Sequence, residues 1–177
     1  MSYHPTKSEA LEYLQDIVVG LPDPYRGFCE RVIYDEAFRT GIASSGHHPA
    51  AHQTPGGLPI HTAEVLHHCL SVFNAEVSLP VLITATIWHD YLKTEEYTLT
   101  NVGVVMKTLY ARRIGHVVGG ALEFADRSAG WDLPEREAIL HCLLSHHGRR
   151  EWGSPVTPAT LEAHILHWAD MLSTAGI

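Results

Sequence analysis

The residues best suited to chemistry in this chain are histidines and aspartates at the predicted ends of helices. They lie far apart in the sequence, each beside a turn signal or at the edge of an apolar segment. Imidazole and carboxylate groups together are ligands that Mn(II), Fe(II), Co(II), Ni(II) and Zn(II) accept, whereas Mg(II) and Ca(II) prefer oxygen alone. The candidate metal ligands are His61, His89, Asp90, His116, His146 and Asp170.

Asp90 is the residue that could join two metal ions. Paired catalytic metals lie about 3.5–4 Å apart and need a bridging ligand, which a carboxylate with two oxygens supplies and an imidazole does not. Asp90 follows His89 at the end of the most apolar segment, Leu79 to Trp88. Neighbouring helical residues diverge by about 100°, yet both can face a site that lies across a helix end. The sequence therefore predicts two divalent transition-metal ions (Mn, Fe, Co, Ni or Zn) as cofactors.

Composition limits the classes of protein that fit. The chain has 14 histidines among 177 residues, spread from His4 to His167, so they are not a terminal tag. A net charge of -8 argues against a surface that grips long nucleic acid by counterion release. Three cysteines without a CxxC pair, no leader-like segment and no long apolar run favour a cytoplasmic protein that does not cross a membrane.

Helical periodicity dominates, and we expect an all-α bundle of about seven to eight helices. The first helix follows a capping box at Thr6 to Glu9, and the second runs from Asp23-Pro24 to Gly41. Residues 42–59, which are rich in Gly, Pro, Ser and His, are predicted to form an irregular loop. Later helices are expected at about 60–75, 80–92, 101–112, 114–127, 134–147 and 158–174. We interpret residues 1–177 as one domain, with 1–41 a helical extension and 42–177 the metal-binding core.

The order of these motifs resembles the HD-domain metal-dependent phosphohydrolase superfamily. The stretches GGLPIHTAEVLHH (56–68), WHDYLK (88–93), IGHVV (114–118), LLSHHGRREWGSP (143–155) and EAHILHWADML (162–172) are most similar to the HD domain of YhaM-type 3′–5′ exoribonucleases. The resemblance implies that His61, His89, Asp90 and Asp170 hold one metal, and that Asp90, His116 and His146 hold the second. It also implies phosphoester hydrolysis with a hydroxide between the two metals as the nucleophile.

The chain departs from the family pattern in two respects. The usual HD-(I/L)-G-K becomes His89-Asp90-Tyr91-Leu92-Lys93, so Leu92 replaces the glycine while the lysine is kept. The separate N-terminal nucleic-acid-binding domain of the exonucleases is not found in the sequence. Together with the negative charge, this favours a nucleotide or short oligonucleotide over long RNA as the substrate.

Several residues near the ligands are expected to meet the substrate. Lys93, Arg149 and Arg150 could bind phosphate, although basic residues at a helix C-terminus also suit the helix dipole. His147 could act as a general acid or contact the substrate. Trp152 is interpreted as a packing anchor for its loop rather than a stacking surface for a base. Loop residues that could line the entrance are His47, His48 and His52.

Two other functions fit the same ligands. An HD-fold di-iron oxygenase would use them to cleave carbon–carbon or carbon–phosphorus bonds with O₂. A non-catalytic HD module would keep its metals for stability or sensing. Metal content and phosphoester turnover separate the three hypotheses.

Overall fold

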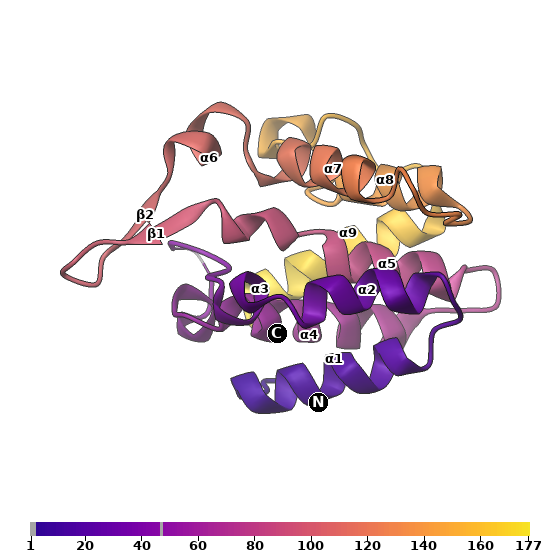
Figure 1. Ribbon diagram of the computed structural model, residues 1–177, viewed down its shortest axis with the longest axis horizontal. Coiled ribbons are helices and arrows are strands. Elements are labelled where there is room, and N and C mark those ends of the chain that lie inside the picture. The colour runs from indigo at the N-terminus through magenta and orange to yellow at the C-terminus, as the bar shows by residue number, and fades with distance from the viewer. Residues whose placement is uncertain (1–2, 47) are drawn as a thin grey trace.

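The structure, a computed structural model, describes residues 3–46 and 48–177 and is almost wholly helical (Figure 1). The all-α class is therefore confirmed, with nine α-helices rather than seven or eight among the described residues. The α-helices are α1 (Lys7–Val19), α2 (Tyr25–Ile33), α3 (Glu36–Thr40), α4 (Gly57–Val72), α5 (Leu79–Trp88), α6 (Leu109–Arg113), α7 (His116–Arg127), α8 (Arg136–Ser145) and α9 (Leu161–Ala175). Shorter elements are the 3₁₀ helices η1 (Ala50–Gln53), η2 (Tyr91–Thr94) and η3 (Arg150–Trp152) and the strands β1 (Tyr97–Leu99) and β2 (Val105–Lys107).

One hydrophobic core runs through the bundle. It includes α1 and α2 as well as the later helices, from Ala10 to Ala169. Helix α4 packs against α1 on one side and α9 on another, while α7 and α8 form a layer above α5 (Figure 1). At the centre the Phe28 ring stacks on Trp88 with 4.7 Å between centroids and meets Phe124 edge-on. Burying such aromatic groups removes large apolar areas from water and fixes the helices that carry the polar site.

Local sequence signals mark where helices α1 and α4 begin. Thr6 and Glu9 form the expected reciprocal capping box at the start of α1. Gly56 adopts a left-handed conformation (φ 91°) directly before α4, where residues with a side chain are disfavoured. A Cβ on Gly57 would lie 2.5 Å from the carbonyl oxygen of His52, so the Gly-Gly turn lets η1 pack against the start of α4. Residues 42–59 are thus less irregular than expected, because they contain η1 and the first turn of α4.

The helix predicted to run as far as Gly41 is broken into two. Helix α2 ends at Ile33, and α3 begins again at Glu36. Asp35 causes the restart, because its side chain accepts a hydrogen bond from the Ala37 amide and so caps α3.

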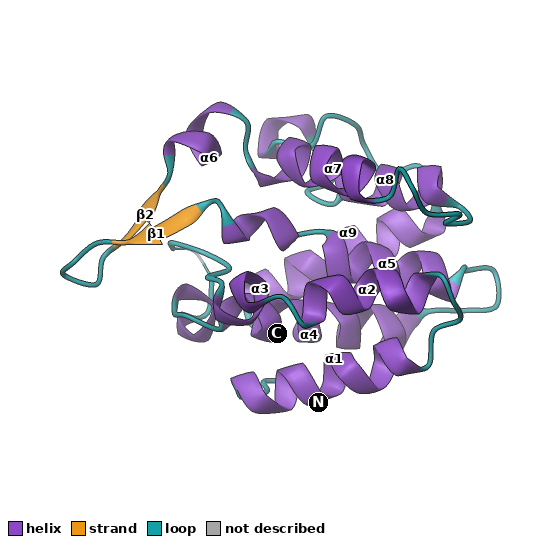
Figure 2. Cartoon of the chain, in the orientation of Figure 1, coloured by secondary structure: helices purple, strands orange, loops and turns teal. Residues whose placement is uncertain are grey.

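The prediction of a helix over 101–112 is wrong, because most of that segment forms a β-hairpin (Figure 2). Strands β1 and β2 pair antiparallel, with Thr98 opposite Met106. The connection is stabilised by hydrogen bonds from the Gly103 amide to the Thr100 carbonyl and from the Thr100 amide to the Val104 carbonyl. Gly103 takes a positive φ of 78°, which suits a tight turn and disfavours a helix. Only α6 remains of the predicted helix.

In the part of the chain that the structure describes, no helix is both long and apolar enough to cross a membrane. The division into an extension (1–41) and a core (42–177) stays a prediction.

Candidate metal centre

Four of the candidate ligands meet where α4, the end of α5 and α9 come together. His61 lies in the second turn of α4, His89 and Asp90 follow the last residue of α5, and Asp170 lies on α9. One ligand atom of each lies within 4.8 Å of the others, and all four residues are buried. His61 Nε2 is 3.1 Å from Asp90 Oδ2 and 3.2 Å from Asp170 Oδ1. This group is called group A below.

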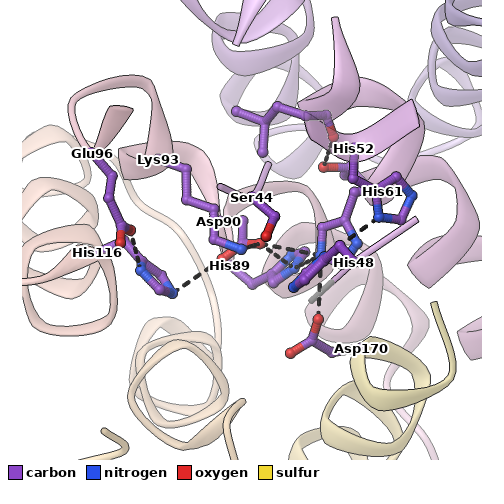
Figure 3. A network of polar contacts seen from close by, with 12 residues as sticks. Ser44, His48, His52, His61, His89, Asp90, Lys93, Glu96, His116 and Asp170 are labelled. Atoms are coloured by element: carbon purple, nitrogen blue, oxygen red, sulfur yellow. Dashed lines mark hydrogen bonds and ion pairs between the residues drawn. The ribbon is translucent and has the colours of Figure 1, made fainter. Parts of the chain in front are cut away.

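A second group faces the other oxygen of Asp90. His116 opens α7 and His146 follows the last residue of α8, so both lie at helix ends as the sequence predicted. Their Nε2 atoms are 3.4 Å and 3.7 Å from Asp90 Oδ1. His147 joins them, since its Nε2 is 3.1 Å from that of His116. These three histidines form group B, and Figure 3 shows Asp90 between the His116 side and the His61 side.

The histidines present the same nitrogen to the centre because the other nitrogen has an acceptor. His89 Nδ1 donates to the Thr86 carbonyl and His146 Nδ1 to the Leu143 carbonyl, both at 2.7 Å. His147 Nδ1 donates to the Trp152 carbonyl, also at 2.7 Å. We assign the proton to Nδ1 in each ring from these acceptors, which leaves the Nε2 lone pair free. Such outer hydrogen bonds hold a metal-binding imidazole in the required tautomer and orientation.

His61 is oriented through a buried polar chain that sequence reasoning did not identify. Its Nδ1 lies 3.0 Å from Ser173 Oγ, and that hydroxyl donates to Glu64 Oε2 at 2.7 Å. The hydroxyl therefore accepts the His61 proton. Glu64 also accepts from His52 Nε2 at 3.0 Å. Glu64 and Ser173 are only 3% and 1% exposed, so each lost hydrogen bond would leave a buried polar group unsatisfied.

His116 is oriented by Glu96, which was also missed. Its Nδ1 lies in a short ion-pair contact with Glu96 Oε2, and Lys107 Nζ lies 2.9 Å from Glu96 Oε1. The proximity of His116 and Lys107 outweighs burial and holds the pKa of the Glu96 carboxyl at about 2. The signal was hidden because Glu96 lies between η2 and β1, in a region where the sequence predicted no element.

Electrostatics keep Asp90 and the histidines of group B in metal-binding forms. Burial would raise the pKa of Asp90, but Lys93 and the neighbouring histidines hold it well below its usual range. Burial lowers the pKa of His116 and of His146, and it lowers that of His147 to about 4. Neutral imidazole and ionised carboxylate are the forms that bind metals.

The residues fit a divalent cation. Lys93 Nζ lies 2.6 Å from Asp90 Oδ2 as an ion pair. Even so, neither Asp90 oxygen nor His146 Nε2 has a well-oriented hydrogen-bond partner among the described residues, although all three atoms are buried. Buried acceptors that converge without donors are costly unless a cation satisfies them. A mixed imidazole and carboxylate set suits the borderline transition metals.

A cavity of about 690 Å³ opens beside the ligands. Lys93, His48, His147 and Asp170 line it, so three of the predicted substrate or catalytic residues face one space. A neighbouring cavity of about 380 Å³ shares Lys93, His48 and His147 and extends to Lys107.

The other predicted substrate residues lie elsewhere. His52 is fully buried and borders neither cavity, so it would act through its contacts with Glu64 and His48. Arg149 and Arg150 are exposed and border neither cavity; the Arg149 guanidinium lies over the Trp152 ring at 4.7 Å. Trp152 is 47% exposed, so it is not the packing anchor that the sequence predicted. His47 lies outside the described residues.

Comparison with known proteins places the chain in one family. The sequence matches the HD domain family over residues 59–175. Among curated proteins, it is 34% identical over 147 residues to the 3′-5′ exoribonuclease YhaM of Listeria monocytogenes, covering 80% of this chain and 45% of that protein. It is 29% identical over 175 residues to the protein of the same name from Oceanobacillus iheyensis, covering 94% of this chain and 53% of that protein.

The chain spans about half the length of the curated relatives it matches. The search of solved structures found no significant match. Family membership and the ligand groups together support a metal-dependent hydrolase. The HD match covers well over half of the chain, and the curated relatives cover most of it, so the chain belongs to the HD domain family.

Proposed function

We propose that this chain binds two divalent transition-metal ions and hydrolyses a phosphoester bond of a nucleotide or short oligonucleotide. The observation that carries the proposal is the position of Asp90. Its Oδ2 faces His61 in group A and its Oδ1 faces His116 and His146 in group B. A carboxylate whose two oxygens serve two ligand groups is the arrangement that a metal pair requires.

The metals would supply charge neutralisation on the phosphate and activation of water. The protein's own part is to hold the ligands and to position the substrate. Lys93 is suited to a phosphate: it lines both cavities, and the Asp90 carboxylate outweighs burial and raises its pKa, so the ammonium stays charged.

His147 fits better as a ligand or hydrogen-bond acceptor than as a general acid. Its Nδ1 proton is committed to the Trp152 carbonyl. Burial lowers its pKa to about 4, so its Nε2 carries no proton to give near neutral pH. We therefore assign His147 to group B.

The relatives are named 3′-5′ exoribonucleases, which makes an RNA 3′ end a substrate to consider. We favour a short one for this chain. Its net charge is -8, and the lysines on the two cavities, Lys93 and Lys107, already pair with Asp90 and Glu96. Long RNA is held by many unpaired cations along its path.

The experiment measures metals per chain and then turnover with added Mn(II). Substrates are bis(p-nitrophenyl) phosphate, mononucleotides, and oligoribonucleotides from dinucleotides to long RNA. We expect two metals and the highest kcat/KM on the short substrates. Higher kcat/KM on long RNA would overturn the size preference. Bound metal with no turnover would overturn the proposed hydrolase activity. In that case, O₂ consumption by a mixed-valent iron pair would indicate an oxygenase. The absence of both activities would indicate a sensor.

A further inference from the structure

Trp152 is an exposed aromatic residue at the edge of the metal centre. Its side chain borders the 690 Å³ cavity on one side and a smaller cavity of about 240 Å³, beside His116, on another. Large aromatic side chains are usually well buried, as Trp88 is in this chain, because exposing them leaves much apolar area in water. An indole that is 47% exposed and borders two cavities is therefore available to a ligand.

The backbone holds this indole at a set position relative to the ligands. The Trp152 carbonyl accepts the Nδ1 proton of His147, a member of group B. The turn around it is closed by hydrogen bonds from the Trp152 amide to the Arg149 carbonyl and from the Gly153 amide to the Arg150 carbonyl. Gly153 has a φ of 100°, a conformation that side chains strongly disfavour, so the turn depends on glycine here.

Arg149 further orders the ring. Its guanidinium lies 4.7 Å from the ring centroid, a cation–π contact that orients the indole before any ligand arrives. Binding then costs less side-chain entropy, because the ring is already held. Arg149 borders neither cavity, so it supports the platform from outside.

The larger cavity is lined by two chemically different kinds of group. Lys93, His48 and the ligand Asp170 supply charged and polar groups, while Trp152 and Met171 supply apolar surface. A nucleotide has the same division between an anionic phosphate and a flat base. The volume of 690 Å³ lies in the range of ordinary small-molecule sites, about 300–1,000 Å³.

We propose that Trp152 is the stacking wall of a nucleobase subsite, and that it makes the centre prefer nucleotides over phosphoesters without a base. The proposal rests on the proposed function, because it places the scissile phosphate beside Lys93 and the metals. Stacking on an aromatic residue strengthens binding by about 5- to 150-fold per base and tolerates different bases. The subsite therefore selects a base without selecting which base.

The test compares AMP with ribose 5-phosphate, which has the same phosphate and sugar but no base. Their dissociation constants are measured by calorimetry on the Mn(II)-loaded full chain. In the wild type we expect AMP to bind more tightly. Trp152→Leu, which keeps an apolar side chain without the flat ring, should reduce the AMP preference about tenfold. Trp152→Phe, which keeps a ring, should retain most of it.

Trp168→Ala is the matched control. Trp168 is 65% exposed on α9 and borders neither cavity, so its loss should leave the AMP preference at the wild-type value. Metals per chain are measured in every variant, and the comparison of Leu with Phe at position 152 separates stacking from a general loss of fold.

The outcomes separate this proposal from the proposed function. Equal affinity of the wild type for the two ligands, or an unchanged preference in Trp152→Leu, would overturn the base subsite even if the chain hydrolyses phosphodiesters. A preference for AMP that depends on Trp152, in a chain without any hydrolysis, would support the subsite and overturn the catalytic function alone.

Discussion

Oδ1 of Asp90 lies 3.4 Å from Nε2 of His116, although the two residues belong to different layers of the bundle. The same carboxylate reaches His61 on α4 with its other oxygen. One side chain thus connects ligand groups carried by helices that are far apart in sequence, and this makes Asp90 the first residue to test.

Replacing Asp90 with Ala should lower the metal content of both groups and abolish hydrolysis, because each group loses a carboxylate oxygen. Metals per chain and turnover on bis(p-nitrophenyl) phosphate measure the effect. Asp126→Asn changes an exposed aspartate and should leave both values at wild type. Wild-type hydrolysis by Asp90→Ala would refute the proposed mechanism.

Replacing Glu96 with Gln should weaken group B selectively. His116 would lose its ion-pair partner, and outer-shell changes of this kind typically cost about 10–100-fold in metal affinity or activity. Titration with Mn(II) should show one site near wild-type affinity and one weakened site. The neighbouring exposed Glu95 provides the control Glu95→Gln. Equal weakening of both sites would contradict the assignment of Glu96 to group B.

Replacing Ser173 with Ala should weaken group A instead. His61 Nδ1 would lose the hydroxyl that accepts its proton, and Glu64 would lose one of its donors. We expect a loss in metal affinity of about 10–100-fold at one site. Ser71→Ala, which removes an exposed hydroxyl, is the control. If Ser173→Ala and Glu96→Gln affect the same site, the two groups do not hold separate metals.

Replacing Lys93 with Met should shift the pH dependence of activity as well as raise KM for phosphoesters. Burial raises the pKa of Asp90, and Lys93 is the largest influence that lowers it. Without the ammonium the Asp90 pKa rises, so protons compete with metal at higher pH and the acidic limb of the pH–activity profile moves upward. Lys93→Arg keeps the charge and should keep the limb near its wild-type position. An unshifted limb in Lys93→Met would show that Lys93 does not set the ionisation of Asp90.

Replacing Thr6 with Ala should destabilise the fold by about 1 kcal/mol, because α1 loses its N-cap. The metal content should stay unchanged. Hydrogen bonds from Thr6 lower the pKa of Glu9 below its unfolded value. The stability that the ionised Glu9 carboxylate contributes is therefore present above the unfolded pKa of Glu9, and it is lost as the pH falls through the folded pKa. The difference in unfolding free energy between variant and wild type should shrink on acidification, as measured by urea unfolding at neutral and acidic pH. A constant difference would exclude a role for the Glu9 charge.

Some features of the fold could be predicted because they depend on neighbours in the chain. The capping box at Thr6 and the apolar segment before His89 are local patterns, and each marks a helix in the structure. The segment from residue 97 to 107 was missed for the opposite reason. Its strands have three residues each, too short for a periodic signal, and the hairpin depends on Gly103 and on pairing across the turn.

The sequence by itself determined which residue types stand at helix ends, and so the chemistry that this chain can offer to a metal. Only the tertiary structure decided which of them meet. Glu96 and Glu64 are ordinary acidic residues in the sequence. They orient His116 and His61 only because packing brings the Glu96 carboxylate to a His116 ring nitrogen and the Glu64 carboxylate to the Ser173 hydroxyl that contacts His61. The exposure of Trp152 is likewise decided by the tertiary structure and not by its neighbours in the sequence. Burial and contact at these positions arise when segments far apart in the sequence pack together. The local spacing of residues does not encode which distant segments meet.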